Sequence, residues 1–283
     1  MTQFSVLQHE ADGLSAGLPP LMVEADHLAA SASLGVHGRR RAGMGESFWQ
    51  FRRYASPDSS SAIDWRQSAK SQHIFVRERE WEAAQTVWFW RDASANMSFK
   101  SGPVSKRARA DLLLLALASL LVRGGERVGF TGMEGSPASS RLALTRIGRA
   151  MFAAGDYALP PQVPFARGNQ LVWFSDFLDE DVFEAMKRLS RQGVEGHLVR
   201  VIDPAEEDFP YSGRTRFESP RDEAAEIFGR AERVRTSYRA RFIAHGERIA
   251  QAAARLGWTC TAHRTDHAPQ ASLIALHAAI SGA

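Results

Sequence analysis

The stretch TVWFWRDASANM at residues 86–97 constrains the fold more than any other part of the chain. Its first half is bulky, apolar and β-prone, which is typical of a strand buried on both faces of a parallel sheet. Asp92 and Ser94 come directly after this strand, where open α/β sheets place their ligand sites. A carboxylate and a hydroxyl on one tight loop suit a hard divalent cation. The same residue types also form turns and helix N-caps, so both interpretations stay open at this point.

From residue 86 onward, strand-like and helix-like segments alternate. Strands are expected over 86–91, 127–132, 170–177, 196–203 and 258–263, and helices over 106–123, 141–153, 180–191, 221–256 and 270–280. This alternation predicts an α/β fold, a doubly wound and mostly parallel sheet of Rossmann type with right-handed crossovers. Residues 204–219 are predicted to form an irregular insertion that contains half of a hairpin.

The first 85 residues differ in character from the rest. They predict an N-terminal segment (1–85) with a small β-containing subdomain, followed by the α/β domain (86–283). A helix is expected over 21–32, irregular chain over 38–53, a turn or short helix over 62–69 and a strand over 73–79. The aromatic residues of this segment are expected to form the core of the small subdomain: Phe48, Trp49, Phe51, Tyr54 and Trp65.

Composition excludes several classes of protein. The single cysteine, Cys260, rules out an intrachain disulfide and a cysteine-type zinc site. The longest apolar run, 112–122, is too short to span a bilayer, and the N-terminus lacks the pattern of a signal peptide. We therefore expect a cytoplasmic protein without membrane insertion.

Basic residues cluster in the N-terminal segment at Arg39, Arg40, Arg41, Arg52 and Arg53. They are candidate partner-binding residues, and a solvated basic loop is the alternative. The formal net charge is only +3, so nucleic acid is not the expected partner, because a basic footprint matters only when it is extensive. Binding of an anionic polymer through the run at 39–41 remains a further alternative.

A second carboxylate follows another buried strand, because Asp176 lies at the end of the expected strand over 170–177. Parallel strands end at one edge of a sheet, so Asp92, Ser94 and Asp176 should meet there and form a plausible Mg²⁺ or Mn²⁺ site. The alternative is that Asp176 caps the helix that begins near 179–181.

Signals of specific enzymes are absent from the sequence. It contains no Gly-x-Ser-x-Gly elbow around Ser94, no Gly-Lys-Ser/Thr phosphate loop and no His-Glu-x-x-His pair. A magnesium-dependent phosphoesterase that uses Asp92 and Asp176 is kept as the alternative to a non-enzymatic protein.

Three stretches together resemble a known family. They are GMGESFWQFRRY at 43–54, AIDWRQSAK at 62–70 and the Asp92-x-Ser94 strand end, with FSDFL at 174–178 as a fourth match. This order is similar to the "domain of unknown function 58" family over about residues 35–280. The resemblance implies a von Willebrand factor A-like domain that follows the Gly/Arg/aromatic block.

The resemblance also implies a metal-ion-dependent adhesion-like site. Asp92 and Ser94 match its first two ligands, Asn96 stands where a second Ser belongs, and Asp176 matches its last Asp. The segment 155–169 contains no Thr for the remaining position, so the implied Mg²⁺ or Mn²⁺ site is degenerate.

The family resemblance also implies a function. Such proteins are associated with MoxR-type AAA+ ATPases and act as adaptors in chaperone-like maturation of client proteins. Many carry membrane helices before the conserved block, and this sequence has none there, so the resemblance points to a cytoplasmic short form. The expected function is a non-enzymatic, protein-binding adaptor.

Overall fold

The structure is a computed structural model that describes residues 20–33, 48–55, 63–79, 84–220 and 225–281. The chain divides into a larger unit, Met1–His37 with Gln85–Ala283, and a smaller unit, Gly38–Ala84. None of the helices within the described ranges combines the length and the apolar character needed to cross a bilayer.

The larger unit is built on a sheet of five parallel strands in the order β4-β3-β5-β6-β9. Their bounds are β3 (Thr86–Arg91), β4 (Arg127–Phe130), β5 (Gln170–Ser175), β6 (Glu195–Ile202) and β9 (Thr259–Arg264). Strand β5 is buried at every position. Its apolar sequence, like that of β3, reflects a strand that is covered on both faces.

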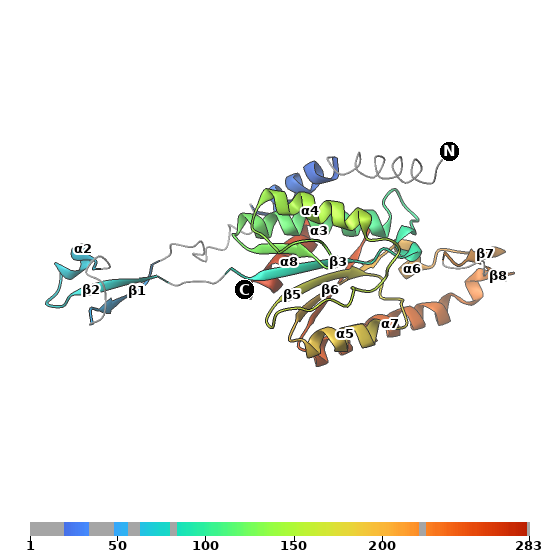
Figure 1. Cartoon of the computed structure of the whole chain (residues 1–283). Helices are drawn as coiled ribbons and strands as arrows, with labels where there is room; N and C mark the ends of the chain where they lie inside the picture. The colour runs from blue at the N-terminus through green and yellow to red at the C-terminus, as the bar shows by residue number, and fades with distance from the viewer. Residues whose placement is uncertain (1–19, 34–47, 56–62, 80–83, 221–224, 282–283) are drawn as a thin grey trace. The chain divides into compact units, whose positions relative to one another are not determined.

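Helices cover both faces of this sheet (Figure 1). Their bounds are α3 (Lys106–Arg123), α4 (Arg141–Ala153), α5 (Val182–Arg191), α7 (Arg235–Arg255) and α8 (Pro269–Ile280). Helices α3, α4 and α8 pack together on one face, and α5 and α7 pack together on the other. This mixed α/β architecture with a parallel central sheet was predicted from the alternating sequence pattern, and the predicted bounds of these strands agree within two residues.

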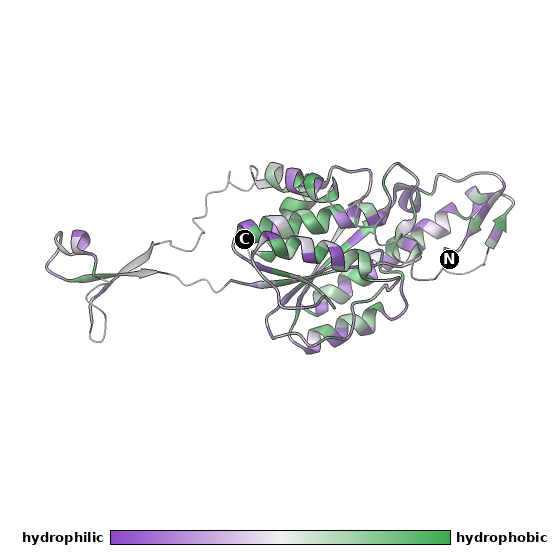
Figure 2. Cartoon of the chain, turned by 45° about the horizontal axis from the view of Figure 1, so that its top comes forward, coloured by the Kyte–Doolittle hydropathy of each residue, from purple (hydrophilic) through white to green (hydrophobic). Residues whose placement is uncertain are grey.

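Helix α3 is the central helix of the core. Ser105 caps it by accepting a hydrogen bond from the Ala108 N–H at 3.1 Å, and Gly125, with a φ of 89°, follows its end. Its leucines are buried on all sides, because the sheet, α4, α8 and the helix over 20–33 surround it. The outer helices alternate hydrophobic and hydrophilic residues, as Figure 2 shows, which is expected of helices with one face on a core.

The chain between β6 and α7 differs from the prediction. Helix α6 (Pro204–Asp208) is followed by an antiparallel hairpin of β7 (Thr215–Glu218) and β8 (Ala225–Phe228), and then by the short η3 (Ala231–Arg233). The helix expected over 221–256 therefore begins only at Arg235, and Phe228 is a strand residue. The hairpin forms in place of the first turns of the expected helix, because it lets Phe228 pack edge-on against Phe217, with ring centroids 5.8 Å apart.

The smaller unit pairs β1 (Phe48–Arg53) with β2 (Phe75–Arg79) in antiparallel fashion. Irregular chain was expected over 38–53, but its last six residues form a strand. Asp64 caps the short α2 (Trp65–Ser68) by accepting from the Gln67 N–H at 2.9 Å.

The aromatic core expected for the smaller unit is corrected at two positions. The side chain of Trp65 is 67% exposed and that of Tyr54 is 39% exposed. Trp65 is the first residue of the one-turn α2, which contacts β2 but has no buried residue. The side chains of the other three predicted core residues, Phe48, Trp49 and Phe51, lie outside the described part.

Candidate functional site

The order of the central sheet reverses at the junction of β3 and β5. The chain leaves β3 to form β4 on one side and then returns to form β5 on the other side. In open α/β sheets the crevice outside the carboxyl ends at such a switch point is the usual ligand site. Asp92 follows β3 and Asp176 follows β5, and the Asp92 N–H donates to the Phe174 carbonyl at 2.8 Å. Both carboxylates therefore lie at this edge.

Asp92 is a buried carboxylate held by two donors. Its Oδ1 accepts from the Ser94 N–H at 2.8 Å, and its Oδ2 accepts from the Ser175 hydroxyl at 2.6 Å. Burial, and then the negative charge of Asp176, raise the pKa of Asp92 above its ordinary value, while the hydrogen bonds from Ser175 and Ser94 oppose that rise. The protein thus holds a carboxylate in a place that disfavours its charge, which is typical of functional sites.

The residue after Asp176 has an unusual backbone conformation. Phe177 has a φ of 58°, which costs a bulky residue about 1–3 kcal/mol, and residues with such a backbone cluster at functional sites. Its N–H donates to the Ser175 hydroxyl at 2.8 Å, and its carbonyl accepts from His245 Nε2 at 2.9 Å. These contacts hold the turn that presents Asp176.

Asp176 does not cap helix α5. The N-cap of that helix is Asp181, and the Oδ1 atom of Asp176 accepts from the Leu178 N–H at 3.1 Å. Its other oxygen, Oδ2, faces the amino end of α3.

Lys106 meets Asp176 there, and sequence reasoning missed it. It is the first residue of α3 and is 1% exposed. Its Nζ atom lies 2.9 Å from Asp176 Oδ2 and 2.5 Å from Glu206 Oε1. Burial lowers the pKa of an ammonium, but the charges of Asp176 and Glu206 outweigh that effect and raise the pKa of Lys106 above its ordinary value. We call Lys106, Asp176 and Glu206 the ion cluster.

Helix α6 fixes the third member of the ion cluster. Asp203 caps α6 in a capping box, and the Asp203 N–H donates to Glu206 Oε2 at 2.9 Å. The next two acidic residues do not join the ion cluster but pair with Arg264. Glu207 Oε2 lies 2.7 Å from Arg264 Nη1, and Asp208 Oδ2 lies 3.1 Å from Arg264 Nη2. The acidic run 206–208 thus ties α6 to α3 and to the end of β9.

Two further predicted ligands lie on the loop after β3. The Ser94 hydroxyl is buried and makes no well-aligned hydrogen bond within the described ranges. Asn96 belongs to the short η2 (Ala95–Ser98) and is half-buried. The guanidinium of Arg107 closes this loop by donating to the carbonyls of Ala93 and Ser94.

The arrangement fits a lysine-neutralised cluster better than a divalent cation. The described ranges contain no group of three or more His, Cys, Asp and Glu side chains that could hold a metal ion. The ammonium of Lys106 already sits against Asp176, so a cation sharing that carboxylate would meet a like charge. Binding of Mg²⁺ or Mn²⁺ by Asp92, Ser94, Asn96 and Asp176 therefore stays a prediction, and no chemical step is built on it.

The predicted basic partner-binding residues belong to the smaller unit. Arg39, Arg40 and Arg41 lie outside the described residues. Arg52 lies within β1, and Arg53 ends that strand and is exposed. Their role in partner binding stays a prediction.

A protein family matches more than half of the chain. The family described as "Protein of unknown function DUF58" matches residues 50–248, which include the edge with Asp92, Asp176 and Glu206. No curated protein matches the chain significantly.

Two solved structures from Bacteroides resemble the chain distantly. One is a conserved hypothetical protein BatB from Bacteroides thetaiotaomicron, with 14% identity and a TM-score of 0.36, over 71% of this chain and 98% of that chain. The other is an aerotolerance-related membrane protein from Bacteroides fragilis NCTC 9343 with multiple mutations to serines. It has 16% identity and a TM-score of 0.39, over 71% of this chain and 100% of that chain.

Proposed function

Because this chain belongs to the DUF58 family of proteins of unknown function, we propose that it is a protein-binding adaptor whose larger unit is a von Willebrand factor A-like domain. In this proposal the partner binds at the sheet edge where β3 and β5 end. The proposed partners are a MoxR-type AAA+ ATPase and a client protein, and the adaptor itself catalyses no reaction.

The observation that carries the proposal is the convergence of charged groups at the switch point of the sheet. Asp92 is buried with a raised pKa, and the backbone of Phe177 is strained beside it. An enzyme at this edge would need an activated nucleophile. The histidine at this turn, His245, is engaged with the Phe177 carbonyl. Charged groups held in place at a sheet edge suit the recognition of a complementary surface, because such groups give specificity and orientation.

The test is affinity capture by the full chain from the extract of its own cells, with mass spectrometry of the bound proteins. We compare the wild type with Asp92→Asn, which keeps the shape of the side chain and removes its charge. The matched control is Glu195→Gln, the same carboxylate-to-amide change at the exposed first residue of β6, at the opposite end of the strands.

We expect a MoxR-type ATPase to be enriched with the wild type and the control. Its capture should fall at least about tenfold with Asp92→Asn, because the amide weakens the internal hydrogen bonds from Ser94 and Ser175 that hold the two loops of this edge together. Equal capture by all three proteins would mean that the interface lies away from this edge. Recovery of no AAA+ ATPase by the wild type would contradict the proposed partnership. Hydrolysis of a phosphate ester that is lost in Asp92→Asn would favour an enzyme instead.

A further inference from the structure

A cavity of about 320 Å³ opens next to the ion cluster, between β6, α6 and α7. Asp176 and Glu206 form part of one wall, and Arg200 lies on the strand side. The side from α7 consists of a tyrosine, an arginine, a phenylalanine and a histidine, one helical turn apart or less: Tyr238, Arg241, Phe242 and His245.

Arg200 is a buried cation without an anionic partner. It is 8% exposed, and its guanidinium carbon lies 4.2 Å from the ring centroid of Phe242. Its Nη2 atom makes one long hydrogen bond, to the Phe242 carbonyl at 3.5 Å. No carboxylate of the described residues lies within ion-pair distance of it. Buried charges are normally paired, so this guanidinium has unused donors.

Helix α7 is shaped around this side chain. Gly246 lies in the middle of the helix, where a glycine costs about 1 kcal/mol relative to alanine. A Cβ atom at residue 246 would meet Arg200 Nη1 at 2.3 Å. The glycine therefore leaves room for the guanidinium beside the helix backbone, within 4.2 Å of the ring centroid of Phe242.

The charges around the cavity favour an anion. The two carboxylates in its wall share the ammonium of Lys106, whereas Arg200 and Arg241 face the cavity without ion-pair partners among the described residues. Counting Lys106, these five charged groups carry one net positive charge. Tyr238 stays a hydrogen-bond donor, because burial, and then the charge of Glu206, raise its pKa to about 12.

We propose that this cavity binds a carboxylate on a short aliphatic body, such as a glutamate side chain, with Arg200 as the anchor. A guanidinium presents a planar fork of donors that matches a carboxylate in a bidentate geometry. The flanking apolar side chains, Leu178 and Ile202, cover the aliphatic body. This deepens the proposed function by naming the chemistry of the partner residue that binds at this edge.

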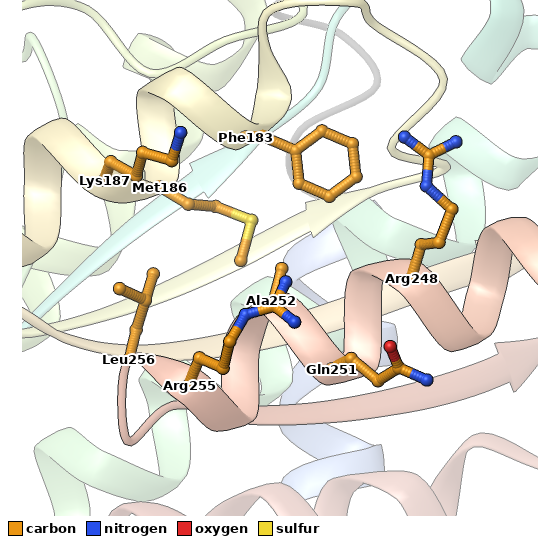
Figure 3. Close-up of a pocket in the computed structure, with 8 residues that line it drawn as sticks. All are labelled: Phe183, Met186, Lys187, Arg248, Gln251, Ala252, Arg255 and Leu256. Carbon is orange, nitrogen blue, oxygen red and sulfur yellow. The ribbon is translucent and has the colours of Figure 1, made fainter.

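A second surface pocket of the larger unit lacks such an anchor. It measures about 300 Å³ and lies between α5 and α7, where Figure 3 shows Lys187, Arg248 and Arg255 around Phe183 and Met186. All three of these cations are exposed, and Lys187 pairs with Glu184 at 2.7 Å. Arg248 stacks 5.3 Å from the Phe183 ring. Arg248 therefore serves as the matched control, because it is also an arginine next to an aromatic ring but lies outside the proposed site.

The experiment is calorimetric titration of the full chain with four probes. The peptide acetyl-Ala-Glu-Ala-amide tests a carboxylate carried by a protein, and its glutamine counterpart tests the need for charge. Glutarate tests a free small acid, and inorganic phosphate tests a different oxyanion. These probes need no ATPase, so the titration is independent of the capture experiment that tests the proposed function.

Three variants accompany the wild type. Arg200→Met removes the anchor, Gly246→Ala keeps the charge but displaces the guanidinium, and Arg248→Met is the control. We expect the glutamate peptide or glutarate to bind the wild type and the control equally. Arg200→Met and Gly246→Ala should each bind at least about tenfold more weakly, as expected for a lost charge-assisted hydrogen bond. If Arg200→Met does not fold, the affinity of Gly246→Ala for the glutamate peptide and glutarate tests whether Arg200 is the anchor.

Each result of the titration has a definite meaning. Binding of glutarate but not of the glutamate peptide would keep the carboxylate site and assign it to a small acid. Tighter binding of phosphate than of both carboxylates would overturn the proposal. Equal binding of the glutamate and glutamine peptides, unchanged binding in Gly246→Ala, or no binding to the wild type would also overturn it.

Discussion

The Nζ atom of Lys106 lies 2.9 Å from the Oδ2 atom of Asp176, across 70 residues of sequence. The pair joins the amino end of α3 to the carboxyl end of β5, and Glu206 completes it from α6. Since all three side chains are largely removed from water, each depends on the others for its charge to be tolerated.

Replacing the cation should therefore be costly. We expect Lys106→Met to lower the free energy of unfolding by about 3–5 kcal/mol, because it leaves two carboxylates without their partner in a buried place. Urea unfolding followed by circular dichroism measures the change. The control is Lys187→Met, which removes an exposed lysine paired with an exposed Glu184 and should change stability by no more than about 0.5 kcal/mol. A similar small effect for Lys106→Met would mean that the ion cluster does not stabilise the fold.

The raised pKa of Asp92 predicts a pH-dependent gain for Asp92→Asn. A carboxyl group whose pKa is higher in the folded than in the unfolded state adds stability at low pH, and this is lost as the pH rises above its ordinary pKa of 3.8. The asparagine variant has no such loss. The difference in unfolding free energy between variant and wild type should therefore grow in favour of the variant between pH 3.5 and pH 7.

Urea titrations at several pH values measure that difference. Titrating groups far from residue 92 are common to both proteins and largely cancel. The variant also relieves the repulsion between Asp92 and Asp176, which acts in the same direction, so the comparison reports on this pair. A difference that stays constant with pH, or that changes in the opposite direction, would contradict the assigned direction of the pKa shift.

Divalent cations should leave the stability of the wild type unchanged. A ligand that binds only the folded state raises the melting temperature in proportion to the logarithm of its concentration above Kd. Because Lys106 occupies the neighbourhood of Asp176, we expect no such rise with Mg²⁺ or Mn²⁺ up to millimolar concentration, and no fall with a chelator. A rise that disappears in Asp92→Asn would instead establish the metal site that the family resemblance implies.

A close approach between β6 and the residue before β9 gives a further prediction. A Cβ atom at residue 196 would lie 2.1 Å from the indole of Trp258, whose Nε1 atom donates to the Val194 carbonyl at 3.0 Å. Gly196→Ala should therefore destabilise the larger unit by about 1–3 kcal/mol, the usual cost of overpacking. Thermal unfolding measures it against Gly102→Ala, where the added methyl group meets nothing within 4 Å.

The sheet and its helices could be predicted from the sequence because each is encoded locally. The apolar run at 86–91 and the leucine-rich helix at 106–123 carry their own periodicity, and both appear with the predicted bounds. The switch-point edge follows from the chain order of the strands. The sequence order of the strands therefore predicts that Asp92 and Asp176 lie at one edge.

The rest depends on contacts that no local pattern shows. Lys106 looks like an ordinary first-turn lysine until α6, 100 residues later, brings Glu206 to it. Arg200 looks like one polar residue in a strand, and only Gly246 in α7 reveals the space made for it. The start of α7 was misplaced because the hairpin residues 225–228 continue the apolar stripe of the helix, so that amphipathic periodicity alone could not separate strand from helix.

The ion cluster can form only late during synthesis of the chain. Its members come from residues 106, 176 and 206, so a nascent chain that has not yet released α6 from the ribosome holds Lys106 and Asp176 without their third partner. A contact between residues far apart in sequence closes a loop of intervening chain, and this closure costs conformational entropy. The ion cluster is therefore completed late in translation, after residue 206 has emerged.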